Sequence, residues 1–111
     1  MKLIIHELGD ITEVIIDGNV LQENIAVLRT RLHDLVDNGK HKLVINLVAV
    51  NYLSSMGLAV IVDIKNRVSG LKGDLKLALA NHLISNLLVI TNLHKKIESF
   101  DTLEEALKSF S

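Results

Sequence analysis

The feature that most constrains the fold is an apolar run that leads into a helical pattern near the middle of the chain. Lys42–Val50 is almost wholly apolar and rich in β-branched residues, which is typical of a strand covered on both faces. Downstream, apolar residues recur at the spacing of one helix face, namely Gly57, Val60, Ile61, Ile64 and Val68. Because buried parallel strands need helical crossovers, this order predicts an α/β fold.

The junction between this strand and this helix carries two adjacent hydroxyls, Ser54 and Ser55. Either serine is predicted to be the N-cap, whose side-chain oxygen accepts a hydrogen bond from an N–H of the first turn. A helix N-terminus is also a place where a phosphate group is well held. Both roles remain open for both serines.

The N-terminal half contains two further strands and a helix. Leu3–Leu8 and Ile11–Asp17 predict a hairpin that turns at Gly9-Asp10,. A helix follows, and Gly39 is a plausible left-handed C-cap for it,. The apolar face of this helix is expected to comprise Ile25, Leu28, Leu32, Leu35 and Val36.

The C-terminal half predicts four more elements. After a turn around Gly70 and Gly73, a strand is expected over Leu75–Leu79. His82–Ile90 is apolar nearly all round, which predicts a short helix buried deeper than usual,. Ile97–Phe100 can form a last short strand, and Asp101–Glu104 is a capping-box pattern that opens a final helix,. The inner face of that helix is expected to carry Leu103, Ala106, Leu107 and Phe110.

Length and composition indicate one compact unit. The chain has 111 residues, of which 49% are hydrophobic, so it can form one core and is too short for two ordinary domains,. Proline is absent, and no linker or low-complexity tract is visible,. We therefore expect a single domain over residues 1–111.

The charge pattern favours neither nucleic acid nor membrane. The formal net charge is −1, and the basic clusters Lys40–Lys42 and His94–Lys96 are short and lack stacking aromatic residues,. No apolar run reaches membrane-spanning length, and the N-terminus lacks the apolar core of a signal peptide. We expect a cytoplasmic protein without direct membrane insertion.

The residue types needed for catalysis are poorly represented. Cysteine is absent, which excludes disulfides and cysteine metal sites, and no glycine-rich phosphate loop follows a strand,. The five histidines show no metal-binding spacing; they are His6, His33, His41, His82 and His94. We expect no catalytic residues, no metal and no cofactor, and therefore no enzyme.

The junction resembles the signature of the STAS domain, which bacterial anti-sigma factor antagonists share with the cytoplasmic tails of sulphate transporters. Tyr52-Leu53 corresponds to the aromatic-apolar pair of that signature, and Gly57-Leu58 matches it as it stands. Ser55 falls on the serine that is phosphorylated in the antagonists, and Met56 replaces a small residue. The resemblance covers essentially the whole chain and implies a mixed sheet of about five strands with about four helices.

The same resemblance implies a site. Ser55 is the expected phosphorylation site, with Ser54 as the second candidate. Ser54 and Leu21 stand where the family commonly carries acidic residues, which are expected to orient a kinase or to bind a metal. The partner-binding surface is expected to comprise Asn19, Val20, Leu21, Gln22, Asn24, Ser54, Ser55, Met56, Leu58 and Ala59.

Two functional hypotheses follow from the resemblance. In the first, the unphosphorylated protein binds an anti-sigma factor of the serine-kinase type, which releases a sigma factor, and phosphorylation ends the binding; a serine phosphatase is a further candidate partner. In the second, the protein is a non-switching scaffold subunit of a stress-signalling assembly or of a lipid ATP-binding cassette transporter. Copurification of a kinase or of a transporter would separate them.

Overall fold

A five-stranded mixed sheet organises the molecule. The computed structural model describes residues 1–111, and its strands lie in the order β1-β2-β3-β4-β5. β1 is antiparallel to β2, whereas β2 to β5 are mutually parallel. The strands are β1 (Lys2–Leu8), β2 (Ile11–Asp17), β3 (Lys42–Asn46), β4 (Asp74–Ala78) and β5 (Ser99–Phe100).

Four α-helices cover the sheet: α1 (Ile25–Asp37), α2 (Ser55–Ser69), α3 (His82–Ile90) and α4 (Leu103–Lys108). Single turns of 3₁₀ helix, η1 (Gln22–Asn24) and η2 (Leu93–Lys95), precede α1 and follow α3. The predicted α/β class, with five strands and four α-helices, is confirmed.

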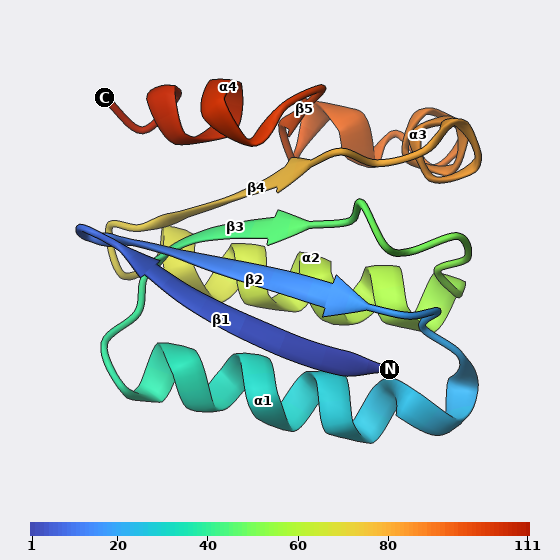
Figure 1. Ribbon diagram of the computed structural model, residues 1–111, viewed down its shortest axis with the longest axis horizontal. Coiled ribbons are helices and arrows are strands. Elements are labelled where there is room, and N and C mark those ends of the chain that lie inside the picture. The colour runs from blue at the N-terminus through green and yellow to red at the C-terminus, as the bar shows by residue number, and fades with distance from the viewer.

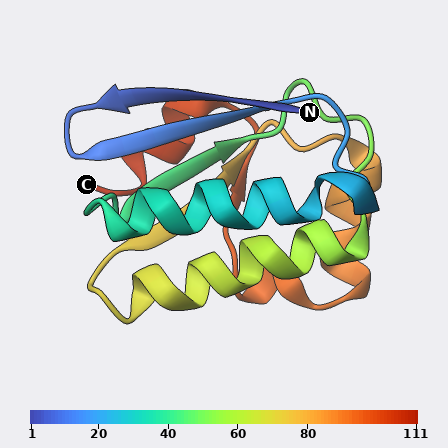
Figure 2. The ribbon, with the colours of Figure 1, turned by 90° about the horizontal axis from the view of Figure 1, so that it is seen from below.

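The helices form layers on both faces of the sheet. α1 and α2 lie side by side against one face, and α4 lies against the other (Figures 1 and 2). A core of 23 buried residues fills the space between the sheet and α1, α2 and α3. A smaller cluster joins the sheet to α4 and consists of Val44, Ala78 and Ala106.

Two glycine turns form as predicted. Gly9 has a φ of +69° in the hairpin, where Leu8 pairs with Ile11. Gly39 has a φ of +86° after α1, and its N–H donates to the Val36 carbonyl at 3.0 Å. The N–H of Lys40 donates to the Leu35 carbonyl, also at 3.0 Å, which completes a Schellman motif,.

The central strand is shorter than the apolar run predicted. β3 ends at Asn46 rather than Val50, because the Asn46 side chain accepts a hydrogen bond from the Val48 N–H at 3.0 Å and turns the chain. The N–H of Val50 donates to the Leu47 carbonyl at 3.0 Å within the same turn. The apolar residues after Asn46 therefore form a loop at the carboxyl end of the sheet.

Three other boundaries shift slightly. β4 begins at Asp74 and ends before Leu79, whose φ of +63° is left-handed. β5 is limited to Ser99–Phe100. The N-cap of α4 is Thr102 rather than Asp101, since the Thr102 hydroxyl accepts from the Glu105 N–H at 3.1 Å.

The predicted deep burial of α3 is wrong. Only Ile84 and Leu88 are buried, whereas the side chains of Leu83 and Ile90 are 71% and 78% exposed. The helix packs at the side of the sheet through Ile84 and Leu88, with Leu87 partly buried beside them. A large part of its apolar surface therefore faces solvent.

Candidate functional site

The predicted site lies at the carboxyl end of β3, where the loop after β2 meets the start of α2. Val20 and Leu53 form an isolated parallel β-bridge. The Val20 N–H donates to the Tyr52 carbonyl, and the Ser54 N–H donates to the Val20 carbonyl, both at 3.0 Å. The two segments that the sequence placed in one surface are thus joined by backbone hydrogen bonds.

Two asparagines fix the loop that precedes α2. The Asn19 side-chain oxygen accepts from the N–H groups of Asn51 and Tyr52, each at 3.0 Å. From the other side, the Asn81 side-chain amide donates to the carbonyls of Val50 and Asn51 at 3.3 and 3.0 Å. The Asn81 oxygen also caps α3 by accepting from the Ile84 N–H. Sequence reasoning missed Asn81, whose only signal was its position before an apolar helix.

Ser54 is the N-cap of α2. Its hydroxyl oxygen accepts from the Gly57 N–H at 3.1 Å. Gly57 lies so close to the bridge that an added Cβ would be 2.7 Å from Val20 and 2.8 Å from Leu53. The missing side chain at position 57 therefore lets the helix start approach the bridge.

Ser55 is the first residue of α2 and is exposed. Its hydroxyl makes none of the side-chain hydrogen bonds in the structure, in contrast to that of Ser54. The N–H groups of Ser55 and Met56 have no intrahelical acceptor, because they belong to the first helical turn. These groups and the helix dipole create a local environment that favours an anion.

The ten predicted partner-binding residues divide into exposed and supporting positions. Val20 and Leu58 are buried, at 0% and 2% exposure, and form part of the core. Asn19 holds the loop, and the Asn24 oxygen accepts from the Leu21 N–H at 3.0 Å, so both side chains have structural contacts. Ser54, the cap of α2, is partly buried. Besides Asn19, the exposed members are Leu21, Gln22, Ser55, Met56 and Ala59.

Two apolar hollows lie between this surface and α3. One, of about 230 Å³, lies between the loop before α2 and α3, and the other, of about 280 Å³, reaches from Ser55 along α2 to η2. Leu87 lines both. Sequence reasoning missed this contribution of α3, because it took the apolar residues of the helix for core.

The structure contains no group of three or more His, Cys, Asp or Glu side chains arranged to hold a metal ion. The positions where the family commonly carries acids are occupied here by Leu21, which is 38% exposed, and by the capping Ser54. None of the helices combines the length and apolarity needed to cross a bilayer.

Comparisons with known proteins point to one family. The model of the STAS domain matches residues 2–106. A provisionally named anti-sigma factor antagonist of Thermotoga neapolitana, the TM1081 homolog, is 33% identical over 87 residues, or 78% of this chain and 77% of that protein.

Solved structures share the fold. The crystal structure of a provisionally named anti-sigma factor antagonist from Thermotoga maritima has a TM-score of 0.92 at 24% identity, covering 96% of this chain and 92% of that one. The Bacillus cell fate determinant SpoIIAA in its phosphorylated form has a TM-score of 0.77 at 12% identity, covering 99% and 100% of the two chains.

Proposed function

The chain belongs to the STAS domain family, and we propose that it is a cytoplasmic anti-sigma factor antagonist controlled by phosphorylation of Ser55. The family suggested by the sequence is thereby confirmed. In the proposed role the protein is a binding module rather than an enzyme. Unphosphorylated, it docks on an anti-sigma factor of the serine-kinase type and releases a sigma factor.

The observation that carries this proposal is that the two serine hydroxyls differ in exposure and in hydrogen bonding. The Ser55 hydroxyl is exposed and free at the first residue of α2, whereas the Ser54 hydroxyl is engaged as the cap. A phosphate on Ser55 would lie near the free N–H groups of the helix start, so the modified protein should remain folded. The names of the Thermotoga relatives, and the existence of a phosphorylated form of the SpoIIAA fold relative, support the same role.

Phosphorylation would act on the interface rather than on the fold. It adds about two negative charges to a surface whose exposed neighbours, Leu21, Met56 and Ala59, are apolar,. A hundredfold loss of affinity needs only about 2.7 kcal/mol, which is modest for a dianion that must lose water on docking. The partner supplies ATP, magnesium and the catalytic base, and a phosphatase restores the hydroxyl.

Copurification followed by reconstitution tests this function. We expect the chain to retain an ATP-binding serine kinase, and mass spectrometry after ATP addition to find phosphate on Ser55 and not on Ser54. Calorimetry should show that the kinase releases the wild-type protein once Ser55 is modified, while Ser55→Ala stays bound in ATP. Undiminished affinity of the Ser55-phosphorylated protein would contradict the switch.

A constitutive scaffold is the second candidate, and the exposed apolar surface is what favours it. Met56 is 52% exposed and Leu83 is 71% exposed, so a permanent partner could cover both,. In that case the copurified protein would be an assembly or transporter subunit without kinase activity. Ser55→Ala would then behave as the wild type with and without ATP.

A further inference from the structure

We propose that the groove between α2 and α3 receives an amphipathic helix of the partner, aliphatic along one side and acidic at the end that lies over η2. This inference rests on the proposed function, because Ser55 lines the groove, and it adds the chemistry of the partner segment.

The groove consists of the two apolar hollows, with Leu87 between them. In the first hollow the loop before α2 faces α3, and in the second the first half of α2 faces the end of α3 and η2. The first hollow is lined by Asn51, Tyr52, Leu53, Leu83, Ile84 and Leu87. The second is lined by Ser55, Leu58, Ala59, Val62, Asp63, Leu87, Thr91 and Leu93.

The exposed surface of α3 extends the groove outward. Leu83, Leu87 and Ile90 are spaced four and three residues apart, so they lie on one stripe of the helix,. Leu83 and Ile90 are 71% and 78% exposed, and the neighbouring Val89 is 56% exposed. Adjacent large aliphatic side chains on one short helix form a patch of the kind that marks a binding site.

Two apolar hollows separated by one side chain suit a helical ligand. Residues i and i+4 of a helix lie one above the other on the same face, about 6 Å apart along the axis. Two aliphatic side chains at this spacing could enter the hollows on either side of Leu87. This is the general mode in which an amphipathic helix binds an apolar groove.

Two lysines beside the η2 end of the groove indicate which end of the ligand is acidic. The segment from Leu75 to Ile97 contains no aspartate or glutamate. Lys95 and Lys96, at and after the end of η2, are exposed and take part in none of the salt bridges in the structure. Asp63, on the α2 side, would repel an acidic residue, so the acidic end of the ligand belongs over η2. These positions favour an acidic helix end by electrostatic complementarity.

Ser55 connects this groove to regulation. Because Ser55 lines the second hollow, a phosphate there would put a dianion beside the aliphatic side chain that enters it,. The loss of binding then follows from the cost of desolvating the phosphate and requires no change of fold.

A pair of designed peptides tests the proposal without a cognate partner. Both are labelled helices of about 18 residues with two leucines at i and i+4, and they differ only in ending in two glutamates or in two lysines. We expect fluorescence anisotropy to show at least about tenfold tighter binding of the glutamate peptide, or about 1.4 kcal/mol. Amide shifts in NMR spectra should map its contacts to α3, η2 and the first half of α2.

Matched variants assign the contacts. Leu83→Asp should weaken the glutamate peptide about tenfold or more, whereas Val27→Asp, at a 52% exposed position on α1, should leave it unchanged,. The double variant Lys95→Glu with Lys96→Glu should reverse the preference between the two peptides. Phosphoserine incorporated at position 55 should weaken both peptides, and circular dichroism should confirm that every variant is folded.

Several results would overturn the proposal. They are equal affinity for both peptides, no binding of either, amide shifts confined to α1, or an effect of Val27→Asp as large as that of Leu83→Asp. Binding to phosphatidylglycerol vesicles that Leu83→Asp abolishes, without peptide selectivity, would assign the patch to a lipid surface instead. Peptide binding in the groove without a copurifying kinase would support this inference and contradict the proposed function. A copurifying kinase that binds Leu83→Asp as tightly as the wild type would support the proposed function and contradict this inference.

Discussion

At the scale of single residues, two adjacent serines of the same chemistry have different surroundings. Ser54 has an extended backbone, with φ −66° and ψ 158°, which aims its hydroxyl at the first-turn N–H of Gly57. Ser55 has already entered the helix, its hydroxyl makes none of the side-chain hydrogen bonds, and the residue lines the second hollow. A phosphate on Ser54 would displace the cap, whereas a phosphate on Ser55 would leave the cap in place.

The stabilities of Ser54→Ala and Ser55→Ala should therefore differ. Loss of an N-cap typically costs about 1 kcal/mol, so Ser54→Ala should lower the free energy of unfolding by that amount. Ser55→Ala removes an exposed hydroxyl without a partner and should change it by less than about 0.5 kcal/mol. Urea denaturation measures both, and an equal loss in the two variants would contradict the assignment of the cap.

Gly57 and Gly70, at the two ends of α2, offer a second comparison. In Gly57→Ala the new Cβ would meet Val20 at 2.7 Å and Leu53 at 2.8 Å, and such overpacking costs about 1–3 kcal/mol,. At Gly70, with φ −70°, the nearest atom would be 3.5 Å away, so Gly70→Ala should be neutral or slightly stabilising,. If thermal unfolding ranked the two variants the other way, the close approach at Gly57 would not matter to the fold.

At the scale of elements, the first turn of α2 is exposed on the same side of the helix that is buried one turn later. Val60 is 1% exposed, whereas Met56, four residues earlier, is 52% exposed. One helix thus supports the sheet and presents the candidate interface, since its N-terminal turn projects past the carboxyl end of β3.

Aspartate at these two positions should have opposite consequences. Val60→Asp puts an unpaired carboxylate into the core and should destabilise by about 3 kcal/mol or more. Met56→Asp should cost less than about 1 kcal/mol in stability, because the side chain remains in water, and should weaken partner binding. Comparing denaturation midpoints with affinity for the copurified partner tests both. A Met56→Asp protein less stable than Val60→Asp would contradict the assignment of Val60 to the core and of Met56 to the surface.

Periodicity predicted the elements well because their apolar stripes are local in the sequence. The hairpin at Gly9 and the C-cap at Gly39 also formed as predicted, since both depend on a left-handed backbone that glycine adopts readily,. The start of α2 and the loop at Asn19 were placed together by the family resemblance. The capping role could not be assigned between Ser54 and Ser55, because that choice depends on where the helical backbone begins.

What periodicity could not predict is which element covers an apolar residue. His82–Ile90 has the composition of a core helix, but only Ile84 and Leu88 are buried, and Leu87 is partly buried. Similarly, β3 ends at Asn46 although the apolar run continues to Val50. The Asn46 side chain accepts a hydrogen bond from the Val48 N–H, and this local bond favours a turn over a strand,. The first error comes from tertiary context and concealed half of the groove, whereas the second comes from a local side-chain hydrogen bond,.

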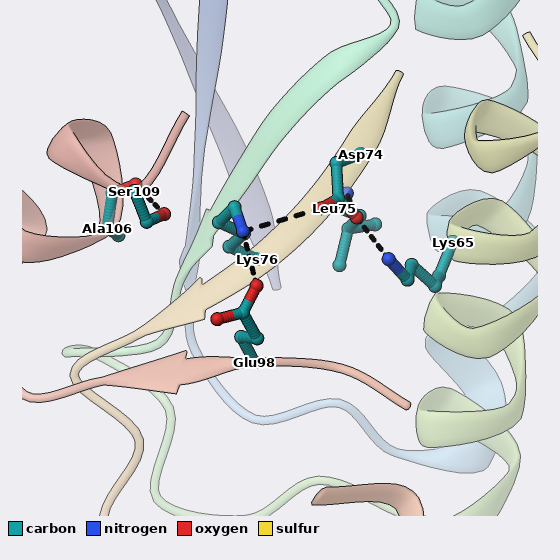
Figure 3. A network of polar contacts seen from close by, with 7 residues as sticks. All are labelled: Lys65, Asp74, Leu75, Lys76, Glu98, Ala106 and Ser109. Atoms are coloured by element: carbon teal, nitrogen blue, oxygen red, sulfur yellow. Dashed lines mark hydrogen bonds and ion pairs between the residues drawn. The ribbon is translucent and has the colours of Figure 1, made fainter. Parts of the chain in front are cut away.

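At the scale of the whole molecule, a network of charges ties α2, β4 and the segment before β5 together (Figure 3). The Lys76 side chain is only 5% exposed, and its amine lies 2.5 Å from Glu98 and 3.4 Å from Asp74. The same amine lies 5.8 and 5.2 Å from the ring centres of Phe100 and Phe110,. Because a buried cation without partners is costly, these contacts fix β5 and α4 against β4.

Asp74 makes this network sensitive to acid. Partial burial alone would raise its pKa, but hydrogen bonds from Lys65 and from the Leu75 N–H, with the charges of Lys65 and Lys76, lower the pKa overall. The folded protein therefore binds this proton less readily than the unfolded chain, whose aspartate pKa is about 3.9. The stabilisation is complete well above that value and is lost as the pH falls through the lower, folded pKa.

Replacement of Asp74 by asparagine should reveal this dependence. At pH 7 Asp74→Asn should lower the free energy of unfolding by about 1 kcal/mol, since the lost hydrogen bonds involve charges but about a third of the side chain is exposed,. As the pH falls below about 4, the aspartate of the unfolded chain gains its proton first, so the difference from Asp74→Asn should shrink. The control is Asp10→Asn. The hydrogen bond from Lys42 also lowers the pKa of Asp10, but the Lys42–Asp10 ion pair is exposed, so the effect of this substitution on stability should disappear in high salt,. Urea denaturation between neutral pH and pH 3 measures all three proteins, and a stability difference for Asp74→Asn that stays constant with pH would show that the carboxylate charge is not its origin.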